Sequence, residues 1–292
     1  MRLHPGPLRS VLELIRLPNV FTAPADVAMG LAVSGAPFAA PQIALLLASA
    51  SAYAGGMALN DAWDAPLDAI ERPERPIPSG RITRAAAFKL AGACLLAGIA
   101  LAALAGARPF WTAVLLALAI VVYDGLAKGS TTGPVSMALC RALNCGMGVA
   151  AGTVSSVSIG PVAILFVYVL IITIVSRFEV MAAPVALVRR AAFAFSALIL
   201  VSAFVSAVGW GGTGVSGLAF LVLLATWLAP PLRQAISEPS PRRIIAVIKT
   251  SVLGIILLDA AFAAASRGAL AGLLVAILFV PAFVLGRRFA SA

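Results

Sequence analysis

Residues 60–78 carry the strongest signal in this chain, and they read Asn-Asp-Ala-Trp-Asp-Ala-Pro-Leu-Asp-Ala-Ile-Glu-Arg-Pro-Glu-Arg-Pro-Ile-Pro. The stretch holds five of the eleven acidic residues, directly after one very apolar segment and shortly before another. Asp61, Asp64 and Asp68 fall at positions i, i+3 and i+7, so a helix that continues through them carries all three on one face, with Asn60 beside them. Carboxylates this close repel one another unless cations neutralise them, and Mg2+ held by one or two carboxylates plus substrate phosphate oxygens is the commonest arrangement. The stretch therefore predicts a site for a divalent metal ion.

The composition places this site in a membrane protein. Of the 292 residues, 62% are hydrophobic and only 11% are charged, which is far from the profile of a soluble globular protein. Roughly 20 apolar residues span a bilayer core, and suitable runs lie near 20–36, 41–59, 84–106, 109–123, 134–154, 159–178, 191–209, 214–230, 244–265 and 268–286. The runs lack the alternation of a barrel strand, so they predict helices. We expect one all-α domain over residues 1–292, a polytopic transmembrane bundle of nine to ten helices.

The basic residues predict the orientation of the bundle. They collect in the segments before the first expected span and after the second, fourth, sixth and eighth, whereas the opposite loops hold only Arg108 and Arg267. Because Lys and Arg collect on the cytoplasmic side, both termini and the acidic stretch should be cytoplasmic. A bacterial inner membrane is the expected location. The net charge of +10 then follows from membrane topology, and no nucleic-acid partner is expected.

The rarer residue types exclude several kinds of chemistry. His4 is the only histidine, so a zinc or iron site of ordinary composition and a Ser/His/Asp triad are both excluded. Cys94, Cys140 and Cys145 lie in apolar runs at spacings that match no metal or redox motif, so we expect packing roles and no disulfide. Any reaction must therefore depend on oxygen ligands and a metal ion.

Polar residues in two other loops lie on the same predicted side of the membrane as the acidic stretch. Tyr123, Asp124 and Lys128 follow the fourth span, and Arg177 and Glu179 follow the sixth. We expect the three loops to converge over one cavity.

Three residues in or near the first two spans carry further expectations. Asn19 and Asp26 are seven residues apart, so one face of the first helix can present both to the cavity. Pro66 lies within the acidic motif and lacks the backbone N–H that a helix needs at that position. We expect the second helix to loosen into its loop there.

Two groups of residues together resemble the UbiA superfamily of intramembrane prenyltransferases. The first group is Asn60-Asp61-x-x-Asp64-x-x-x-Asp68 continued by residues 71–81, which is similar to the first aspartate-rich motif of that family. The second is Tyr123-Asp124 with Lys128, followed by Arg141, Asn144 and Gly148, which looks like the family's segment from the fourth to the fifth helix. Chain length and the series of helices agree too, so the resemblance covers nearly the whole chain.

The resemblance implies a bundle, usually of nine transmembrane helices, around a lipid-open cavity where a prenyl diphosphate binds under a polar cap. Two Mg2+ ions would bridge the diphosphate to the aspartates. Metal and cationic side chains would stabilise negative charge on the leaving diphosphate, and aromatic faces would stabilise positive charge on the prenyl carbon. The implied metal ligands are Asn60, Asp61, Asp64 and Asp68, and the expected catalytic carboxylates are Asp61, Asp64, Asp68 and Glu179. The expected substrate-binding residues are Asn19, Asn60, Arg72, Arg75, Tyr123, Lys128, Arg141, Asn144 and Arg177.

The sequence departs from the family in two places. Where the family has a second aspartate-rich motif, residues 176–184 read Ser-Arg-Phe-Glu-Val-Met-Ala-Ala-Pro, with Glu179 as the only carboxylate. Arg177 can pair with Glu179 or can replace a metal ion by binding diphosphate bidentately, so one and two Mg2+ ions both stay open. An EboC-like branch of the superfamily is compatible with this pattern. Hydropathy also indicates ten spans, and Arg287 and Arg288 favour ten because nine would place them outside.

Three function classes follow from these observations. The first is Mg2+-dependent transfer of a prenyl group from an isoprenoid diphosphate to a small acceptor, aromatic or polyol-like, within the membrane, with membrane lipid as a further partner. The second is a scaffold or carrier derived from the same fold, which the depleted second motif suggests. The third, a CDP-alcohol phosphotransferase, fails because Ala127 comes one position early after Asp124 and no aspartate follows until beyond residue 250. The general base stays open among Asp26, Asp124 and Glu179.

Overall fold

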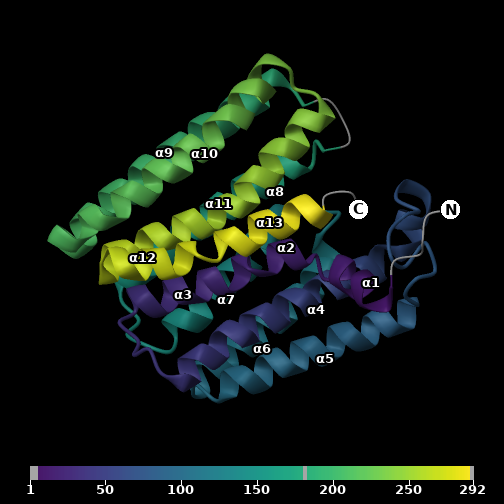
Figure 1. Cartoon of the computed structure of the whole chain (residues 1–292), viewed down its shortest axis with the longest axis horizontal. Coiled ribbons are helices and arrows are strands. Elements are labelled where there is room, and N and C mark those ends of the chain that lie inside the picture. The colour runs from purple at the N-terminus through teal and green to yellow at the C-terminus, as the bar shows by residue number, and fades with distance from the viewer. Residues whose placement is uncertain (1–5, 180–182, 290–292) are drawn as a thin grey trace.

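The structure, a computed structural model, describes residues 6–179 and 183–289, and every regular element in these ranges is helical. The long helices form one bundle, with α9 and α10 along one edge and α5 along the opposite edge (Figure 1). In chain order the elements are α1 (Pro7–Leu14), α2 (Leu17–Val20), α3 (Thr22–Val33), α4 (Ala40–Glu71), α5 (Arg84–Ala103), α6 (Ala107–Val122), η1 (Tyr123–Ala127), α7 (Gly133–Val149), α8 (Ser156–Ser176), α9 (Val185–Trp210), η2 (Gly211–Gly214), α10 (Val215–Ser237), α11 (Pro241–Arg267), α12 (Ala269–Ala276) and α13 (Phe279–Phe289).

Ten helical segments account for the ten apolar runs within the described ranges, which confirms the larger of the two predicted numbers. Seven segments are long and apolar enough to cross a membrane, and one of them, Val185–Ser237, makes two spans because η2 separates α9 from α10. These seven segments thus supply eight spans. The ninth and tenth are the shorter apolar segment Leu17–Val33 and the 17-residue α7. The last span, Ala269–Phe289, combines α12 and α13. This architecture is that of an integral membrane protein.

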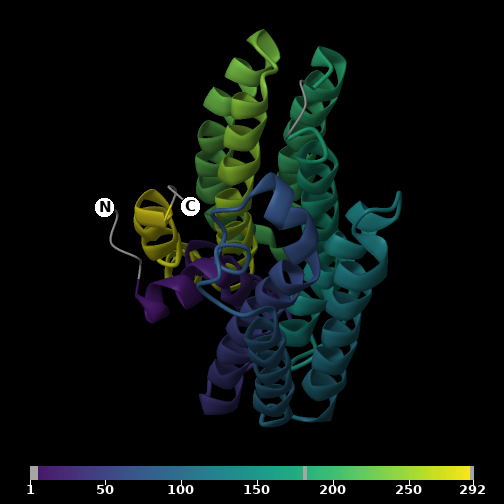
Figure 2. The ribbon, with the colours of Figure 1, turned by 90° about the vertical axis from the view of Figure 1, so that its right-hand side faces the viewer.

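Successive spans alternate in direction, so the loops after α4, η1, α8 and α10 lie at one end of the bundle. Figure 1 places α1 and the end of α13, the first and last described helices, on the same side of the molecule as these loops. Figure 2 views the molecule from that side and shows the loop between α4 and α5 near the middle of the view. The polar connections that the sequence assigned to one side of the membrane therefore share one end of the structure.

Glycine residues let α3 and α7 approach closely. A Cβ atom added to Gly30 would lie 2.3 Å from the carbonyl oxygen of Cys145, and one added to Gly148 would lie 2.3 Å from the carbonyl oxygen of Val27. Small residues at a helix contact permit such an approach and favour helix packing in membranes. The contact sets the separation of two helices that line the cavity described below.

Helix α4 does not loosen at Pro66, so that prediction from the sequence is wrong. The helix continues to Glu71 with Pro66 inside it. A proline removes the N–H that would donate to the carbonyl four residues earlier, which here belongs to Ala62, and Arg84 Nε donates to that oxygen at 2.7 Å. Because a side chain from the next span replaces the missing donor, α4 remains helical as far as Asp68 and beyond.

Gly148→Ala should destabilise the bundle, because the new methyl group overlaps the backbone of α3 and forces the two helices apart. The expected cost is about 1–3 kcal/mol of unfolding free energy, measured as a lower thermal midpoint of the detergent-purified protein. Gly92→Ala is the matched control, since a Cβ atom at Gly92 meets nothing within 4 Å. Equal midpoints for the two variants would show that the close approach of α3 and α7 does not stabilise the fold.

Candidate active site

The acidic face of α4 is paired with basic side chains from other segments. Asp61 Oδ1 lies 3.2 Å from Arg16 Nη2 and 3.5 Å from Arg75 Nη1. The same Arg75 nitrogen lies 2.7 Å from Asp68 Oδ2. Both aspartates are buried, and a buried carboxylate needs a partner because removal from water is costly for a charge. Arg16 and Arg75 supply that partner.

A turn of π-helix, η1, ends the fourth span and directs polar groups toward α4. The Lys128 amide donates to the Tyr123 carbonyl at 2.8 Å, five residues back, which is the π-helical pattern. The Lys128 ammonium forms an ion pair with Asp64, and Asn60 Nδ2 donates to Asp124 Oδ1 at 2.9 Å. Two side-chain contacts therefore join the fourth span to the acidic face.

The carboxylates of this face do not form a ready-made metal cluster. Within residues 6–179 and 183–289, no group of three or more His, Cys, Asp or Glu side chains is arranged to hold a metal ion. Arginine and lysine side chains pair with the carboxylates instead. The prediction that one helix carries all three aspartates is confirmed, whereas the roles of Asn60, Asp61, Asp64 and Asp68 as metal ligands stay predictions.

The chemistry of these donors fits Mg2+, which prefers oxygen ligands and is held by few protein carboxylates. Helix α4 supplies three carboxylates over two turns. Asn60 uses its amide nitrogen for the bond to Asp124, so its amide oxygen remains for a metal ion. A divalent cation at this face would replace the basic side chains, which would then be available to an anion.

Arg16 contacts the acidic face of α4, although the sequence indicated only that it is one of the basic residues before the first expected span. It lies between α1 and α2 with φ of +50°, in the left-handed region that residues other than glycine rarely adopt. Its guanidinium contacts Asp61 from this turn. The signal that could have identified it is its place at the boundary of the first span, three residues before Asn19.

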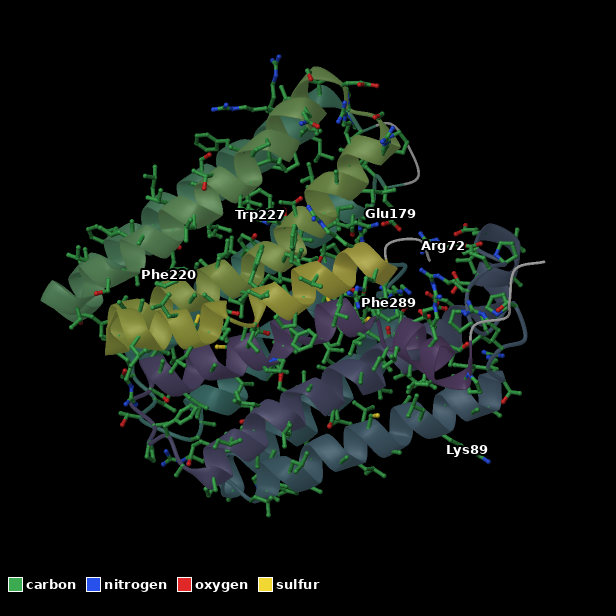
Figure 3. The ribbon with its side chains drawn as sticks, viewed as in Figure 1. Arg72, Lys89, Glu179, Phe220, Trp227 and Phe289 are labelled. Atoms are coloured by element: carbon green, nitrogen blue, oxygen red, sulfur yellow. The ribbon has the colours of Figure 1, made fainter. Side chains whose placement is uncertain are left out.

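The loops after α4 and α8 meet at the same end of the bundle. Arg72 Nη2 lies 2.9 Å from Glu179 Oε1, and Arg177 donates to the carbonyl oxygen of Ser130, in the loop after η1. Figure 3 shows Arg72 and Glu179 close together where the loops gather. The structure thus brings the three predicted loops together. Residues 180–182 of the second motif region lie outside the described residues.

An apolar cavity lies between α3, α4, α6 and α7, and Asp124 links it to the acidic face through Asn60. The polar part of its wall consists of Tyr53, Tyr123, Asp124, Arg141 and Asn144. The apolar part consists of Ala23, Ala52, Gly56, Met57, Leu116, Ile120, Met137 and Cys140. The predicted substrate-binding residues Tyr123, Arg141 and Asn144 therefore line the cavity. The others, which lie elsewhere in the described structure, are Asn19, Asn60, Arg72, Arg75, Lys128 and Arg177.

The side chain of Asp26 contacts two residues of the cavity wall, Arg141 and Asn144. Its side chain is fully buried, and its Oδ2 lies 3.2 Å from Arg141 Nε and accepts from Asn144 Nδ2 at 2.8 Å. Asn144 also donates to the Ala23 carbonyl at 2.9 Å and accepts from Ser49 Oγ at 2.7 Å. These bonds fix the Asn144 amide in the wall, so Asp26 is a positioning residue for the cavity.

Asp26→Ala should destabilise the protein strongly, because it leaves Arg141 as a buried cation without its carboxylate partner. The expected loss is about 3–5 kcal/mol of unfolding free energy, measured as a lower thermal midpoint. Adding Arg141→Leu to Asp26→Ala should recover part of that loss, because the unpaired charge is removed. A double variant no more stable than Asp26→Ala alone would show that the two side chains are not coupled.

The sequence comparisons identify relatives among archaeal prenyltransferases. The digeranylgeranylglyceryl phosphate synthase of Ignicoccus hospitalis is 44% identical over 115 residues, which are 38% of this chain and 38% of that protein. The synthase of the same name from Sulfolobus acidocaldarius is 30% identical over 173 residues, which are 59% of this chain and 62% of that protein. The chain thus spans less than two thirds of the length of these relatives. Because they are archaeal, the bacterial inner membrane stays a prediction.

Solved structures of low sequence identity share the fold. A UbiA homologue from Archaeoglobus fulgidus bound to GPP and Mg2+ has a TM-score of 0.62 at 16% identity, covering 87% of this chain and 99% of that one. A structure reported for digeranylgeranylglyceryl phosphate synthase in membranes has a TM-score of 0.62 at 22% identity, covering 89% and 98%. The model of the UbiA prenyltransferase family matches residues 21–237, well over half of the chain. The protein therefore belongs to the UbiA prenyltransferase family.

Proposed function

We propose that this protein transfers a prenyl group from an isoprenoid diphosphate to an acceptor within the membrane and releases diphosphate, with Mg2+ as its cofactor. The observation that carries the proposal is the acidic face of α4, whose carboxylates and basic partners lie beside an apolar cavity. The cavity suits a hydrocarbon chain, and the charged face suits a metal-bound diphosphate. The cleavage of a prenyl diphosphate needs both the apolar cavity and the charged face.

Residues of this chain are suited to stabilise the two charges that develop in the reaction. Cleavage of the allylic C–O bond builds negative charge on the diphosphate and positive charge on the prenyl carbon. Arg16, Arg75 and Lys128 supply cationic donors for the first charge. Tyr123, in the cavity wall, supplies an aromatic face for the second. Mg2+, when bound, would act as a Lewis acid on the diphosphate oxygens.

The ion pairs of the site also support the binding of a metal-bound anion. Carboxylates and basic side chains neutralise each other here. A magnesium diphosphate carries both signs of charge. The carboxylates of α4 would hold its metal ion, and Arg75 and Lys128 would then be available to its oxygens. Every charged group then keeps a partner, and the penalty for an unpaired buried charge is avoided.

One carboxylate is placed to act as a base. The acceptor hydroxyl must lose a proton as its oxygen attacks the prenyl carbon. Of the three carboxylates considered from the sequence, only Asp124 lines the cavity, whereas Asp26 is held behind Arg141 and Glu179 pairs with Arg72. Asp124 is therefore the base in this proposal.

The relatives support the donor, the metal and a class of acceptor. The Archaeoglobus fulgidus homologue is described as bound to GPP and Mg2+ and to DMAPP and Mg2+. The curated relatives are named digeranylgeranylglyceryl phosphate synthases, which supports an acceptor built on glyceryl phosphate. This favours the polyol-like class over the aromatic class. The proposed acceptor is a lipid hydroxyl on a glyceryl phosphate, reached from the cytoplasmic side that the basic loops predict.

One observation favours a second function, which is binding without turnover. Residues 176–184 contain one carboxylate, on Glu179, and it is paired with Arg72. A scaffold or carrier that has lost the ionisation step would keep the cavity and still bind a prenyl lipid. Release of diphosphate distinguishes the two functions.

Asp61→Ala and Asp64→Ala should each lower Mg2+-dependent diphosphate release on the order of a hundredfold or more, because each removes a proposed metal ligand. The substrate is geranylgeranyl diphosphate with a glyceryl phosphate lipid as acceptor, and the enzyme is purified in detergent. Glu71→Ala is the matched control, an exposed carboxylate at the end of the same helix, and should keep wild-type release. Full activity in both aspartate variants would contradict the proposal, and saturable binding without any release would support the scaffold.

Arg16→Leu should weaken binding of the prenyl diphosphate, because Arg16 offers a charge-assisted hydrogen bond at the acidic face. Loss of such a bond is worth about 1.5–3 kcal/mol, or roughly tenfold to a hundredfold in Kd. Arg9→Leu is the control, since Arg9 is exposed and pairs with Glu13 within α1. Equal Kd values for geranylgeranyl diphosphate in the two variants would exclude Arg16 from the site.

A further inference from the structure

Two charged residues directly after α8, Arg177 and Glu179, contact the loops after η1 and α4. We call these two residues, together with Arg72, the second wall of the site, and it is more basic than acidic. The loop after α4 adds Arg72, which contacts Glu179. The charged groups gathered here are therefore two cations and one anion, whereas the acidic face of α4 has three carboxylates paired with three basic side chains.

The single carboxylate of this wall already has a partner. Glu179 Oε1 accepts from Arg72 Nη2 at 2.9 Å, and the two side chains are 37% and 35% exposed. An ion pair this exposed contributes little to stability. Its main consequence is positional, because it holds the Arg72 guanidinium at the junction of the two loops, as Figure 3 shows.

Arg177 is held from a third loop. Its guanidinium donates to the carbonyl oxygen of Ser130, two residues after Lys128. Lys128 in turn pairs with Asp64 on α4. The loop that anchors Arg177 is therefore also the loop that reaches the acidic face.

The two walls suit different parts of a metal-bound diphosphate. A protein-bound Mg2+ binds one or two carboxylates and completes its coordination shell with phosphate oxygens and water. Helix α4 provides the carboxylates. Guanidinium groups bind phosphate oxygens directly and bidentately, which Arg72 and Arg177 provide for. A metal ion at the second wall would have Glu179 as its only carboxylate, whereas α4 offers three.

We infer that this chain binds its prenyl diphosphate with a single Mg2+ on the α4 aspartates, and that Arg72 and Arg177 bind the remaining diphosphate oxygens at the wall where a second metal ion would sit. The inference rests on the proposed function. It assigns Glu179 to the positioning of Arg72, so the carboxylate acts through a guanidinium and does not ligate metal.

The first test counts metal ions. The full-length protein in detergent is saturated with geranylgeranyl thiolodiphosphate, a donor analogue that ionises slowly, and bound Mn2+ is counted from the loss of the free Mn2+ signal in electron paramagnetic resonance. We expect one Mn2+ per chain in the wild type and in Glu179→Ala, and loss of that ion in Asp64→Ala. Two ions per chain, or loss of an ion in Glu179→Ala, would overturn the inference and leave prenyl transfer standing. Absence of any binding of the analogue would overturn both.

The second test measures the affinity of the analogue at saturating Mn2+. Arg72→Ala and Arg177→Ala should each raise its Kd by about tenfold or more, with the metal count unchanged at one. Lys89→Ala is the control, because Lys89 is an exposed cation on α5 that lies far from Arg72 in Figure 3. Kd values in both arginine variants equal to that of Lys89→Ala would overturn the inference.

Discussion

Charge at the end of one helix is the constraint on which the site depends. Helix α4 places three carboxylates on one face inside a membrane bundle, where unpaired charge is costly. The chain compensates with basic side chains from other segments: Arg16 before α2, Arg75 in the loop after α4, and Lys128 after η1. These ion pairs also hold their segments over one end of the bundle. The contacts that neutralise the carboxylates are therefore the contacts that assemble the site.

The rest of the fold keeps that end in place. Arg84 donates to the Ala62 carbonyl that a proline leaves without its helical donor, so α4 carries its aspartates on an unbroken helix. Close packing at Gly148 brings α3 against α7, and Asp26 orients Arg141 in the cavity wall between them. Local hydrogen bonding, helix packing and a buried ion pair thus position one apolar cavity beside one charged face.

Much of this could be predicted from the sequence, because long apolar runs and helical spacing are local properties. The ten spans and the shared face of the α4 aspartates follow from them. The continuation of α4 past Pro66 was not predictable, because it depends on Arg84 from another span. Arg16 was missed for the same reason: its contact with Asp61 joins residues 45 positions apart. The ligand roles of the aspartates stay predictions, since here they bond to basic side chains.

Binding of geranylgeranyl diphosphate to the wild-type protein, measured by calorimetry with and without Mg2+, tests the central claim most directly. In this account a magnesium diphosphate replaces the ion pairs: the carboxylates bind its metal ion and the basic side chains bind its oxygens. Metal and diphosphate should therefore each bind weakly alone and tightly together. The account predicts saturable binding of the diphosphate that is strongest with Mg2+ and is lost in EDTA. Equal affinity in Mg2+ and in EDTA would contradict it.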